Sequence, residues 1–458
     1  MSAVAARLSI MMFLEFFIWG AWQVTAAKYL GLIGFTGDDI GWTYAVGPIA
    51  GMISPFFVGV VADRFMATEK VLGLLHLLGG VLMYLATRLM TGDSPSPFAI
   101  NLMIFIYALT YFPTIALANS LAMHTMTDAS KEFPRVRVFG TIGWIVAGIT
   151  LAATGWGNTV GMFHLAAATA VLMGLYSFTL PHVPPPAKGQ EVSIREILGL
   201  DALVLLRNRS FLVFLVSSFL ICIPLAFYYQ LAERTVTQAG IANPPFKMTF
   251  GQMSEIFFML VMPWFFARLG VKWMLLAGMA AWVLRYTLFA IGAPEGIAWM
   301  IYLGVLLHGV CYDFFFVTGQ IYTDMAAPAK IRAQAQGLLV LFTLGLGMCI
   351  GAIVAGRIER YYTPPQVQAM KEEAQATAAR VEALEAAKLT GEAESTSSAE
   401  LDAARAKLNE QTVAYLKLLD WRKIWGIPAV LAAVIMVIFA LTFRDNGQRG
   451  AAASDGSG

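Results

Sequence analysis

Charged residues are scarce in this chain: Asp, Glu, Lys and Arg make up only 13% of its 458 residues, against about 25% in soluble domains. Apolar residues make up 58%, more than a soluble core could bury. The sequence also lacks a glycine-rich phosphate loop, a GxSxG motif and an HExxH motif, the usual signatures of nucleotide-binding, hydrolytic and metallopeptidase sites. We therefore expect neither an enzyme nor an ATP-driven pump, and any transport must draw on an ion gradient.

Cysteine is rare as well, and no CxxC or Cys/His spacing indicates a metal site. The three cysteines, Cys222, Cys311 and Cys349, all fall in apolar stretches, where we expect them to pack as small apolar residues. The net charge of +2 comes without a basic tract, which argues against nucleic-acid binding. The sequence thus predicts no metal, no cofactor and no nucleic-acid partner.

Long apolar stretches, in contrast, recur along the whole chain. Each has about 20 residues, the length of a helix that crosses a bilayer core of ~30 Å, and a lone segment in lipid must be helical to satisfy its backbone. Twelve spans are predicted, at 8–30, 40–62, 71–90, 99–126, 136–156, 160–181, 211–233, 248–268, 273–292, 298–323, 334–356 and 424–443. The first is too long for a cleaved signal peptide, and it carries Glu15.

The loops between the spans predict an orientation. Basic residues gather in the loops of one side, whereas the short loops of the other side hold few, among them Lys28 and Lys247. By the positive-inside rule both termini lie in the cytoplasm. We expect a multi-pass protein of the cytoplasmic (inner) membrane.

The chain divides into two halves with faint sequence similarity at an offset close to 200 residues. Thr127-Asp128 in the first half, for example, corresponds to Thr323-Asp324 in the second. Parallel six-span repeats are a known transporter architecture with the site at midplane. The fold class predicted is an all-α membrane protein with twelve transmembrane helices in two six-helix bundles, the major facilitator fold. The expected divisions are an N-terminal bundle at 1–182, a cytoplasmic linker at 183–209 with a short surface helix near 193–206, a C-terminal bundle at 210–445 and a flexible tail at 446–458.

One segment breaks this pattern, because residues 364–418 are rich in Ala, Glu and Lys. They predict an extracytoplasmic hairpin of two helices, the first over 366–389. Ser397 and Glu400 resemble a capping box that begins the second helix. Apolar positions are sparse, so we expect a solvated hairpin that leans on itself.

Ionisable residues inside spans are the strongest functional signal. A charged side chain costs at least ~2.5–3.5 kcal/mol at the centre of a transmembrane helix, so it usually faces the bundle interior. Glu15, Glu255 and Asp313 are the acids that could carry protons, and Arg137 is a base that could pair with one of them. Arg285 we expect to snorkel to the interface or to pair structurally.

Further residues could line a site for a polar ligand with a flat ring. His308 and Tyr312 share a helix face, as do Gln252 and Glu255, and amide groups match hydroxyls or a base edge. The candidate substrate-binding residues are Gln23, Arg137, Thr141, Trp144, Tyr229, Gln252, Glu255, His308, Tyr312 and Asp313. Structural hydrogen bonds between helices remain an alternative. Asp63 and Arg64 are expected to form a cytoplasmic gate.

Eight stretches match the pattern of a known family: FFIWGAW at 16–22, FPTIALAN at 112–119, FPRVRVFGTIG at 133–143, LPH at 180–182, LGLDA at 198–202, WVLR at 282–285, YDFF at 312–315 and RAQAQG at 332–337. In these stretches the chain resembles the nucleoside:proton symporter family of the major facilitator superfamily, typified by bacterial nucleoside permeases. The stretches cover nearly the whole chain outside the insertion and the tail. The resemblance implies a permease that works by alternating access, with substrate and coupling residues at Arg137, Thr141, Gln252, Glu255 and Asp313 and aromatic positions kept in kind at Trp144 and Tyr312.

The chain departs from the family pattern at several of these positions. Ala226 and Tyr229 stand where the family has Gln and Asn, His308 stands for a Tyr, and Glu15 stands for a Gln and could add a second protonation site. The hydrogen-bonding set for base and ribose is partly rewritten.

Three functions therefore remain open at this point. The first is a proton-coupled importer of nucleosides, acting as a monomer in the bilayer. The second keeps the scaffold and moves a sugar, a glycosylated metabolite or a peptidoglycan fragment. The third is a receptor without transport activity, which acts through its periplasmic hairpin.

Overall fold

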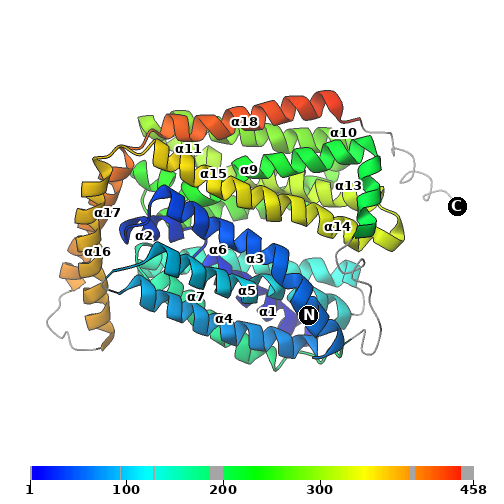
Figure 1. The fold of residues 1–458 in the computed structure, drawn as a ribbon, viewed down its shortest axis with the longest axis horizontal. Helices are drawn as coiled ribbons and strands as arrows, with labels where there is room; N and C mark the ends of the chain where they lie inside the picture. The colour runs from blue at the N-terminus through cyan, green and yellow to red at the C-terminus, as the bar shows by residue number, and fades with distance from the viewer. Residues whose placement is uncertain (1–2, 93, 127–128, 186–199, 391–397, 445–458) are drawn as a thin grey trace.

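The computed structural model describes residues 3–92, 94–126, 129–185, 200–390 and 398–444, and every regular element in these ranges is a helix. Figure 1 shows two helical bundles side by side, with a hairpin of two helices across one end. We call this the hairpin end. The opposite end, where α1 begins and α18 ends, is the terminal end.

The N-terminal bundle is built from the first part of the chain. Its helices are α1 (Ala3–Gly20), α2 (Ala26–Leu32), α3 (Gly37–Arg64), α4 (Thr68–Met90), α5 (Pro97–Thr125), α6 (Ala129–Thr154), the short η1 (Trp156–Asn158) and α7 (Gly161–Ser177). Its buried apolar side chains form one core cluster, joined by Ala226 and Ala352 from the other bundle.

The C-terminal bundle follows, with a core cluster of its own. Its elements are η2 (Leu200–Arg207), α9 (Arg209–Gln238), α10 (Pro244–Glu295), α11 (Ala298–Leu306), α12 (His308–Tyr312), η3 (Asp313–Val317), α13 (Thr318–Ala326), η4 (Ala329–Ile331), α14 (Arg332–Val340), η5 (Leu341–Gly347), α15 (Met348–Tyr361) and α18 (Trp421–Thr442). The hairpin helices α16 (Val367–Thr390) and α17 (Ser398–Leu416) lie between α15 and α18 in the chain.

The twelve expected spans all have a counterpart. Ten helices are long and apolar enough to cross a membrane within the described ranges. One of them, α10, covers two expected spans and changes direction at Gly270, whose φ of 66° lies in the left-handed region that glycine tolerates. The shorter α7 matches the sixth expected span. The described helices therefore provide the twelve expected spans of an all-α membrane protein.

Three spans are less regular than the sequence predicted. The first was expected as one helix over 8–30, but α1 ends at Gly20 and α2 begins at Ala26. The tenth and eleventh each contain a π-helical segment, η3 and η5. Such segments occur often at functional sites, and η3 begins at the candidate proton carrier Asp313.

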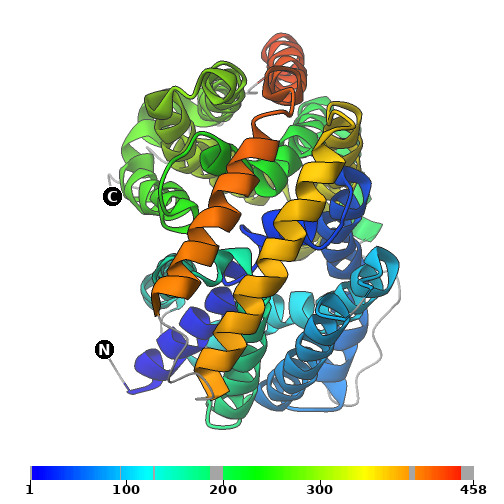
Figure 2. The ribbon, with the colours of Figure 1, turned by 90° about the vertical axis from the view of Figure 1, so that its left-hand side faces the viewer.

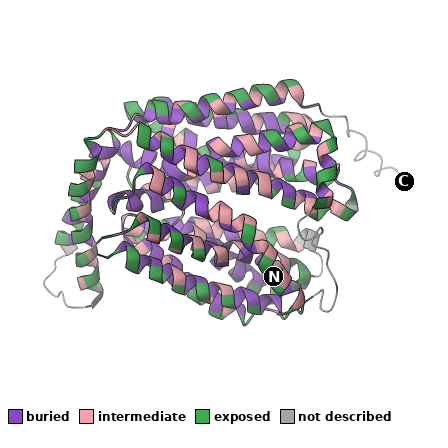
Figure 3. Ribbon diagram, in the orientation of Figure 1, coloured by how far each residue is buried: buried purple, intermediate pink, exposed green. Residues whose placement is uncertain are grey.

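The outer faces of the bundles carry the apolar side chains expected of a membrane protein. In α4, Leu74, Leu78, Val81 and Leu85 recur at helical spacing, and all are 44–53% exposed. Figure 3 shows buried residues turned towards the middle of each bundle and exposed ones turned outward. Since water would disfavour such a stripe, lipid is the solvent that this face requires.

The two bundles make close contact at the hairpin end, where glycines let backbones approach. A β-carbon at Gly356 of α15 would clash with the backbone of Gly37 in α3, and one at Gly148 of α6 would clash with Thr249 of α10. Towards the terminal end, Phe57 of α3 and Phe65, the residue after α3, are 71% and 75% exposed. The close contact between the bundles described by these glycines therefore lies at the hairpin end.

The hairpin is better packed than the sequence predicted. Val367, Ala374 and Val381 of α16 and Leu401 and Leu408 of α17 are buried and belong to the core cluster of the C-terminal bundle. Figure 2 shows both helices lying across the ends of both bundles. The expected capping residue Ser397 lies outside the described residues, as does the first part of the expected surface helix, of which η2 is the described remainder.

We predict that Gly356→Ala lowers the thermal unfolding temperature of the purified protein, whereas Gly426→Ala leaves it unchanged or raises it. Alanine in a helix is favoured over glycine by roughly 0.5–1 kcal/mol, and nothing lies within 4 Å of a β-carbon at Gly426. At Gly356 the clash with Gly37 outweighs that gain, because overpacking costs about 1–3 kcal/mol. Equal shifts of the unfolding temperature in both variants would show that α15 and α3 are not closely packed at Gly356.

Candidate functional site

Helix α6 of the N-terminal bundle presents one polar stripe to the other bundle. Arg137, Thr141 and Trp144 are spaced three to four residues apart, so they share a face, and all three are half-buried. The Arg137 guanidinium lies over the ring of Phe16, 4.0 Å from its centroid. Glycines at 140 and 143 let α1 pack against this helix, because β-carbons there would meet Phe16 and Phe13. The stripe is therefore held rigidly by α1.

Helices α10 and α12 present the facing stripe. Gln252 and Glu255 are half-buried on α10, and Tyr312 is half-buried at the end of α12. Arg137 interacts electrostatically with both Glu255 and Tyr312 across the bundle interface. Charged and polar residues from both bundles thus lie within electrostatic range of one another between α6 and α10.

Two further observations join the bundles at this site. Trp144 and Gln252 line one small cavity, together with Thr25, Pro245 and Thr249. The ring of Tyr229, half-buried on α9, packs against the apolar cores of both bundles. The predicted residues Trp144, Gln252 and Tyr229 therefore lie between the bundles rather than inside one of them.

His308 connects the carboxylate of Glu255 to a stack of aromatic rings. Its Nε2 atom lies 3.8 Å from Oε2 of Glu255. Its ring stacks on Tyr228 at 5.3 Å between centroids and on Tyr312 at 5.9 Å. Gly251 makes room for this ring, since its β-carbon would meet that of His308 at 3.2 Å. The stack ends at the half-buried Tyr312, which offers a flat apolar surface beside a carboxylate.

Asp313 is the most isolated acid of the site. Its side chain is fully buried, and among the described residues neither carboxylate oxygen has a hydrogen-bond partner. It interacts electrostatically with Glu255. An ionised carboxylate in such surroundings is costly, and the neutral acid far less so. This arrangement suits a group that binds and releases a proton.

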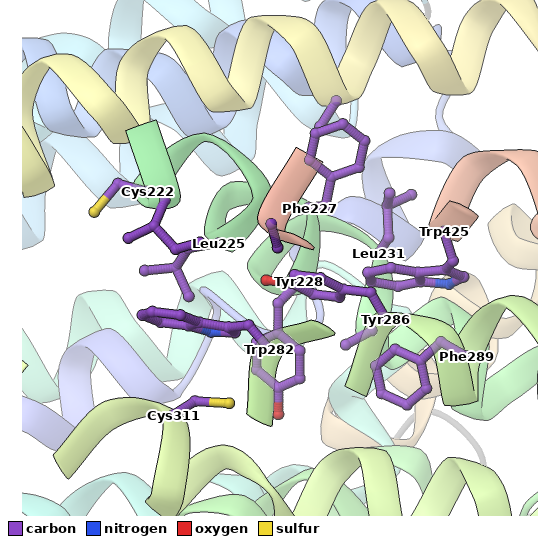
Figure 4. Close-up of a cluster of buried hydrophobic side chains, with 14 of the residues drawn as sticks. Cys222, Leu225, Phe227, Tyr228, Leu231, Trp282, Tyr286, Phe289, Cys311 and Trp425 are labelled. Atoms are coloured by element: carbon purple, nitrogen blue, oxygen red, sulfur yellow. The ribbon is translucent and has the colours of Figure 1, made fainter. Parts of the chain in front are cut away.

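Arg285 was expected to snorkel or to pair structurally; it does not snorkel, and its partner is an aromatic ring instead of a carboxylate. The residue is fully buried, and none of its guanidinium nitrogens has a hydrogen-bond partner among the described residues. Its guanidinium lies 4.1 Å from the centroid of the Tyr228 ring. Tyr228 belongs to the aromatic cluster of the C-terminal bundle that Figure 4 shows with Tyr286, Phe289 and Trp425. The sequence could not predict the contact between Arg285 and Tyr228, because a cation over an aromatic ring has no characteristic residue spacing.

Glu15 lies apart from these carboxylates, within the N-terminal bundle. Its Oε2 is 2.8 Å from His76 Nε2, and its Oε1 accepts a hydrogen bond of 2.7 Å from the Thr114 hydroxyl. Tyr111 donates to its backbone oxygen. The sequence analysis did not single out His76, which the structure places against Glu15. Gln23 is half-buried in the turn between α1 and α2, and its backbone carbonyl accepts a hydrogen bond from the Tyr44 hydroxyl.

The proposed gate residues Asp63 and Arg64 lie at the last turn of α3, at the terminal end. Arg64 is half-buried, and the side chain of Asp63 lies outside the described residues.

Ion pairs at the hairpin end were missed by sequence reasoning. Lys28 of α2 pairs with Glu233 of α9, and both are buried. Asp38 of α3 pairs with Arg360 of α15. Both pairs link the two bundles. Their signal in the sequence was weak, because each of the four residues lies within a few positions of the end of a different expected span.

No group of three or more His, Cys, Asp or Glu side chains in the described ranges could hold a metal ion. The cysteines are free, with Cys222 and Cys311 buried and Cys349 half-buried.

A family model, curated proteins and solved structures are similar to this chain. A family model described as "Nucleoside H+ symporter" matches residues 1–377. The putative nucleoside transporter YegT of Escherichia coli K12 is 44% identical over 360 residues, which is 77% of this chain and 83% of the relative. Xanthosine permease of the same strain is 32% identical over 378 residues, which cover 79% of this chain and 89% of that permease. The crystal structure of the nucleoside transporter NupG is similar with a TM-score of 0.77 and 26% identity, covering 97% of this chain and 100% of that chain.

We predict that Tyr228→Leu lowers the free energy of unfolding by about 2 kcal/mol or more, the worth of a desolvated cation–π contact. Tyr228→Phe should unfold like the parent protein, because it keeps the ring under Arg285 and the Tyr228 hydroxyl has no hydrogen-bond partner among the described residues. Thermal or denaturant unfolding of the purified protein measures both. A large loss in the Phe variant would contradict the cation–π account.

Proposed function

Because the chain belongs to the nucleoside H⁺ symporter family, it is a proton-coupled importer of nucleosides and not an enzyme, and we propose that its transport site lies between α6, α10 and α12. The observation that carries this placement is the cavity that Trp144 of α6 and Gln252 of α10 line together. Arg137 lies on the same face of α6 as Trp144, and Glu255 lies one turn from Gln252 on α10. The site of a twelve-helix transporter built from two repeats lies at such an interface.

Glu255 and Asp313 are the proposed proton carriers. Asp313 is fully buried without a hydrogen-bond partner in the described ranges, and Glu255 is half-buried beside it. Two carboxylates that interact electrostatically share their protons, so that loading one affects the other. Membrane carboxylates of this kind are the usual proton relays of transporters. Glu15 is a further candidate, although its hydrogen bonds to His76 and Thr114 also suit a structural role.

Arg137 is the proposed charge partner of these acids. It approaches Glu255 from the opposite bundle, and its guanidinium also covers the ring of Phe16. When Glu255 releases its proton, the ion attracts Arg137 and favours closure of the two bundles around the site. When Glu255 is protonated, this attraction is lost. Proton binding and bundle movement are coupled in this way.

The nucleoside is proposed to bind with its base against the aromatic rings of Tyr312 and Trp144. Offset or edge-on ring contacts contribute about 0.5–1.5 kcal/mol beyond the buried area. Thr141, Gln252 and Tyr229 supply hydrogen-bonding groups, and Gln252 both donates and accepts. His308 and Gln23 complete the proposed lining.

The orientation of the protein follows from the loops. The positive-inside rule predicts that the terminal end faces the cytoplasm. At the opposite end, the backbones of Gly37 and Gly356 are in close contact and hold the two bundles together. On this basis the structure corresponds to a conformation closed to the outside. Asp63 and Arg64 would then contribute to the cytoplasmic gate, and a monomer contains all the proposed site residues.

We predict that Glu255→Gln and Asp313→Asn each abolish accumulation of radiolabelled nucleoside driven by a proton gradient in proteoliposomes. Both variants remove a proton site while keeping the size of the side chain. Exchange of internal for external nucleoside, which needs no net proton movement, should persist.

The matched control is Glu373→Gln on the exposed face of α16, which should accumulate nucleoside normally. If Glu255→Gln and Asp313→Asn also accumulate nucleoside as the control does, the proton-carrier assignment is wrong. If both exchange and accumulation disappear, the residues serve substrate binding rather than coupling alone.

We predict that Tyr312→Ala raises the KM for nucleoside uptake about tenfold, whereas Tyr312→Phe changes it less than twofold. A factor of ten corresponds to about 1.4 kcal/mol, the upper range of an aromatic contact. Initial uptake rates over a range of nucleoside concentrations give both values. A Phe variant as weak as the Ala variant would assign the contact to the hydroxyl instead of the ring.

A further inference from the structure

The hairpin of α16 and α17 belongs by covalent connection and by packing to the C-terminal bundle. It joins α15 to α18, and its buried residues, among them Val367 and Leu408, lie in the core cluster of that bundle. When the two bundles move relative to each other, the hairpin therefore moves with the C-terminal one.

The tip half of the hairpin nevertheless binds the N-terminal bundle. Arg405 of α17 donates through Nη2 to the backbone oxygen of Thr154 at 2.9 Å, and Thr154 is the last residue of α6. Glu385 of α16 holds the same guanidinium nitrogen at 2.6 Å. The carboxyl end of a helix carries partial negative charge, so a guanidinium there is well placed.

A second contact has the opposite polarity. Glu382 of α16 accepts through Oε1 from the backbone N–H of Val160 at 3.2 Å, and Val160 immediately precedes α7. The amino end of a helix carries partial positive charge and unpaired N–H groups, so a carboxylate is stabilised there. Burial raises the pKa of Glu382, as expected for a carboxyl group covered by protein instead of open water.

The two contacts together form a complementary interface. The cation lies at the carboxyl end of α6 and the anion at the amino end of α7, the two helix ends that one loop of the N-terminal bundle connects. Packing of α16 against α2 adds a third connection, with the Lys371 amine 4.0 Å from where a β-carbon at Gly31 would lie. A solvated hairpin without a role would have no reason to place a cation at the carboxyl end of α6 and an anion at the amino end of α7.

We propose that the hairpin is a strap that holds the two bundles together at the hairpin end and so stabilises the conformation closed to the outside. Opening that end requires Arg405 and Glu382 to leave α6 and α7, in addition to breaking the Lys28–Glu233 and Asp38–Arg360 pairs. The strap thereby sets how often the site opens outward. This inference rests on the alternating access of the proposed function.

The test compares the double variant Glu382→Gln/Arg405→Gln with the matched control Arg380→Gln. The Arg380–Glu400 pair lies within the hairpin and is exposed, so the control alters hairpin charge without touching the N-terminal bundle. Spin labels at Ser94→Cys and Ala298→Cys, both exposed at the hairpin end of different bundles, report the distance between the bundles in full-length protein that carries Cys349→Ala.

The expected result is a longer-distance population that grows at least threefold in the double variant, while the control keeps the distribution of the parent. Uptake by the double variant should also show a lower KM, because a larger outward-open fraction raises apparent affinity in proportion. An unchanged distance distribution in the double variant overturns the strap.

Two further points keep the outcome clear. If the double variant does not fold, as judged by gel filtration and thermal unfolding, the single variants Glu382→Gln and Arg405→Gln are measured, and unchanged distances in both overturn the proposal. The distances are recorded without nucleoside. A protein that fails to transport nucleosides would therefore refute the proposed function and leave the strap to be decided by the distances alone.

Discussion

The cost of placing charge in a hydrocarbon layer governs this structure. An ionisable side chain can remain inside a bilayer only where protein, water or a bound ligand surrounds it. Asp313 meets that condition because it is fully buried in the C-terminal bundle, and Glu255 of the same bundle is half-buried. Arg137 meets it in the N-terminal bundle, where its guanidinium covers the ring of Phe16. Arg285 meets it differently, through the face of Tyr228. The outer surface, by contrast, carries Leu and Val stripes on which charge has no place.

The same constraint explains how the two ends of the molecule differ. At the hairpin end, glycines in α3 and α15 allow backbone contact, and the buried Lys28–Glu233 ion pair crosses the interface. Buried ion pairs add little net stability but cost much when one partner is removed. They are therefore suited to contacts that form in one conformation and exchange partners in another, as alternating access requires. At this end the hairpin adds the contacts of Arg405 with the carboxyl end of α6 and of Glu382 with the amino end of α7.

Much of the architecture could be predicted from the sequence, because the bilayer sets the length and composition of each span. The twelve spans and the family are confirmed. The break after Gly20 and the π-helical turn at Asp313 could not be predicted, since both depend on packing against neighbours. The sequence indicated that Arg137 could pair with an acid from another span, and this stays a prediction. The contact between Arg285 and the Tyr228 ring could not be predicted, because such a contact leaves no trace in residue spacing. The packed hairpin escaped prediction because alanine serves both solvated and closely packed helices.

The central claim is that nucleoside and proton cross together because buried carboxylates must be neutralised before the bundles rearrange. Proton flux into proteoliposomes, followed with an internal pH-sensitive dye while an inward uridine gradient is the only driving force, tests it most directly. The account predicts internal acidification with the parent protein and none with Glu255→Gln/Asp313→Asn. Uridine entry into parent liposomes without any change of internal pH would contradict it.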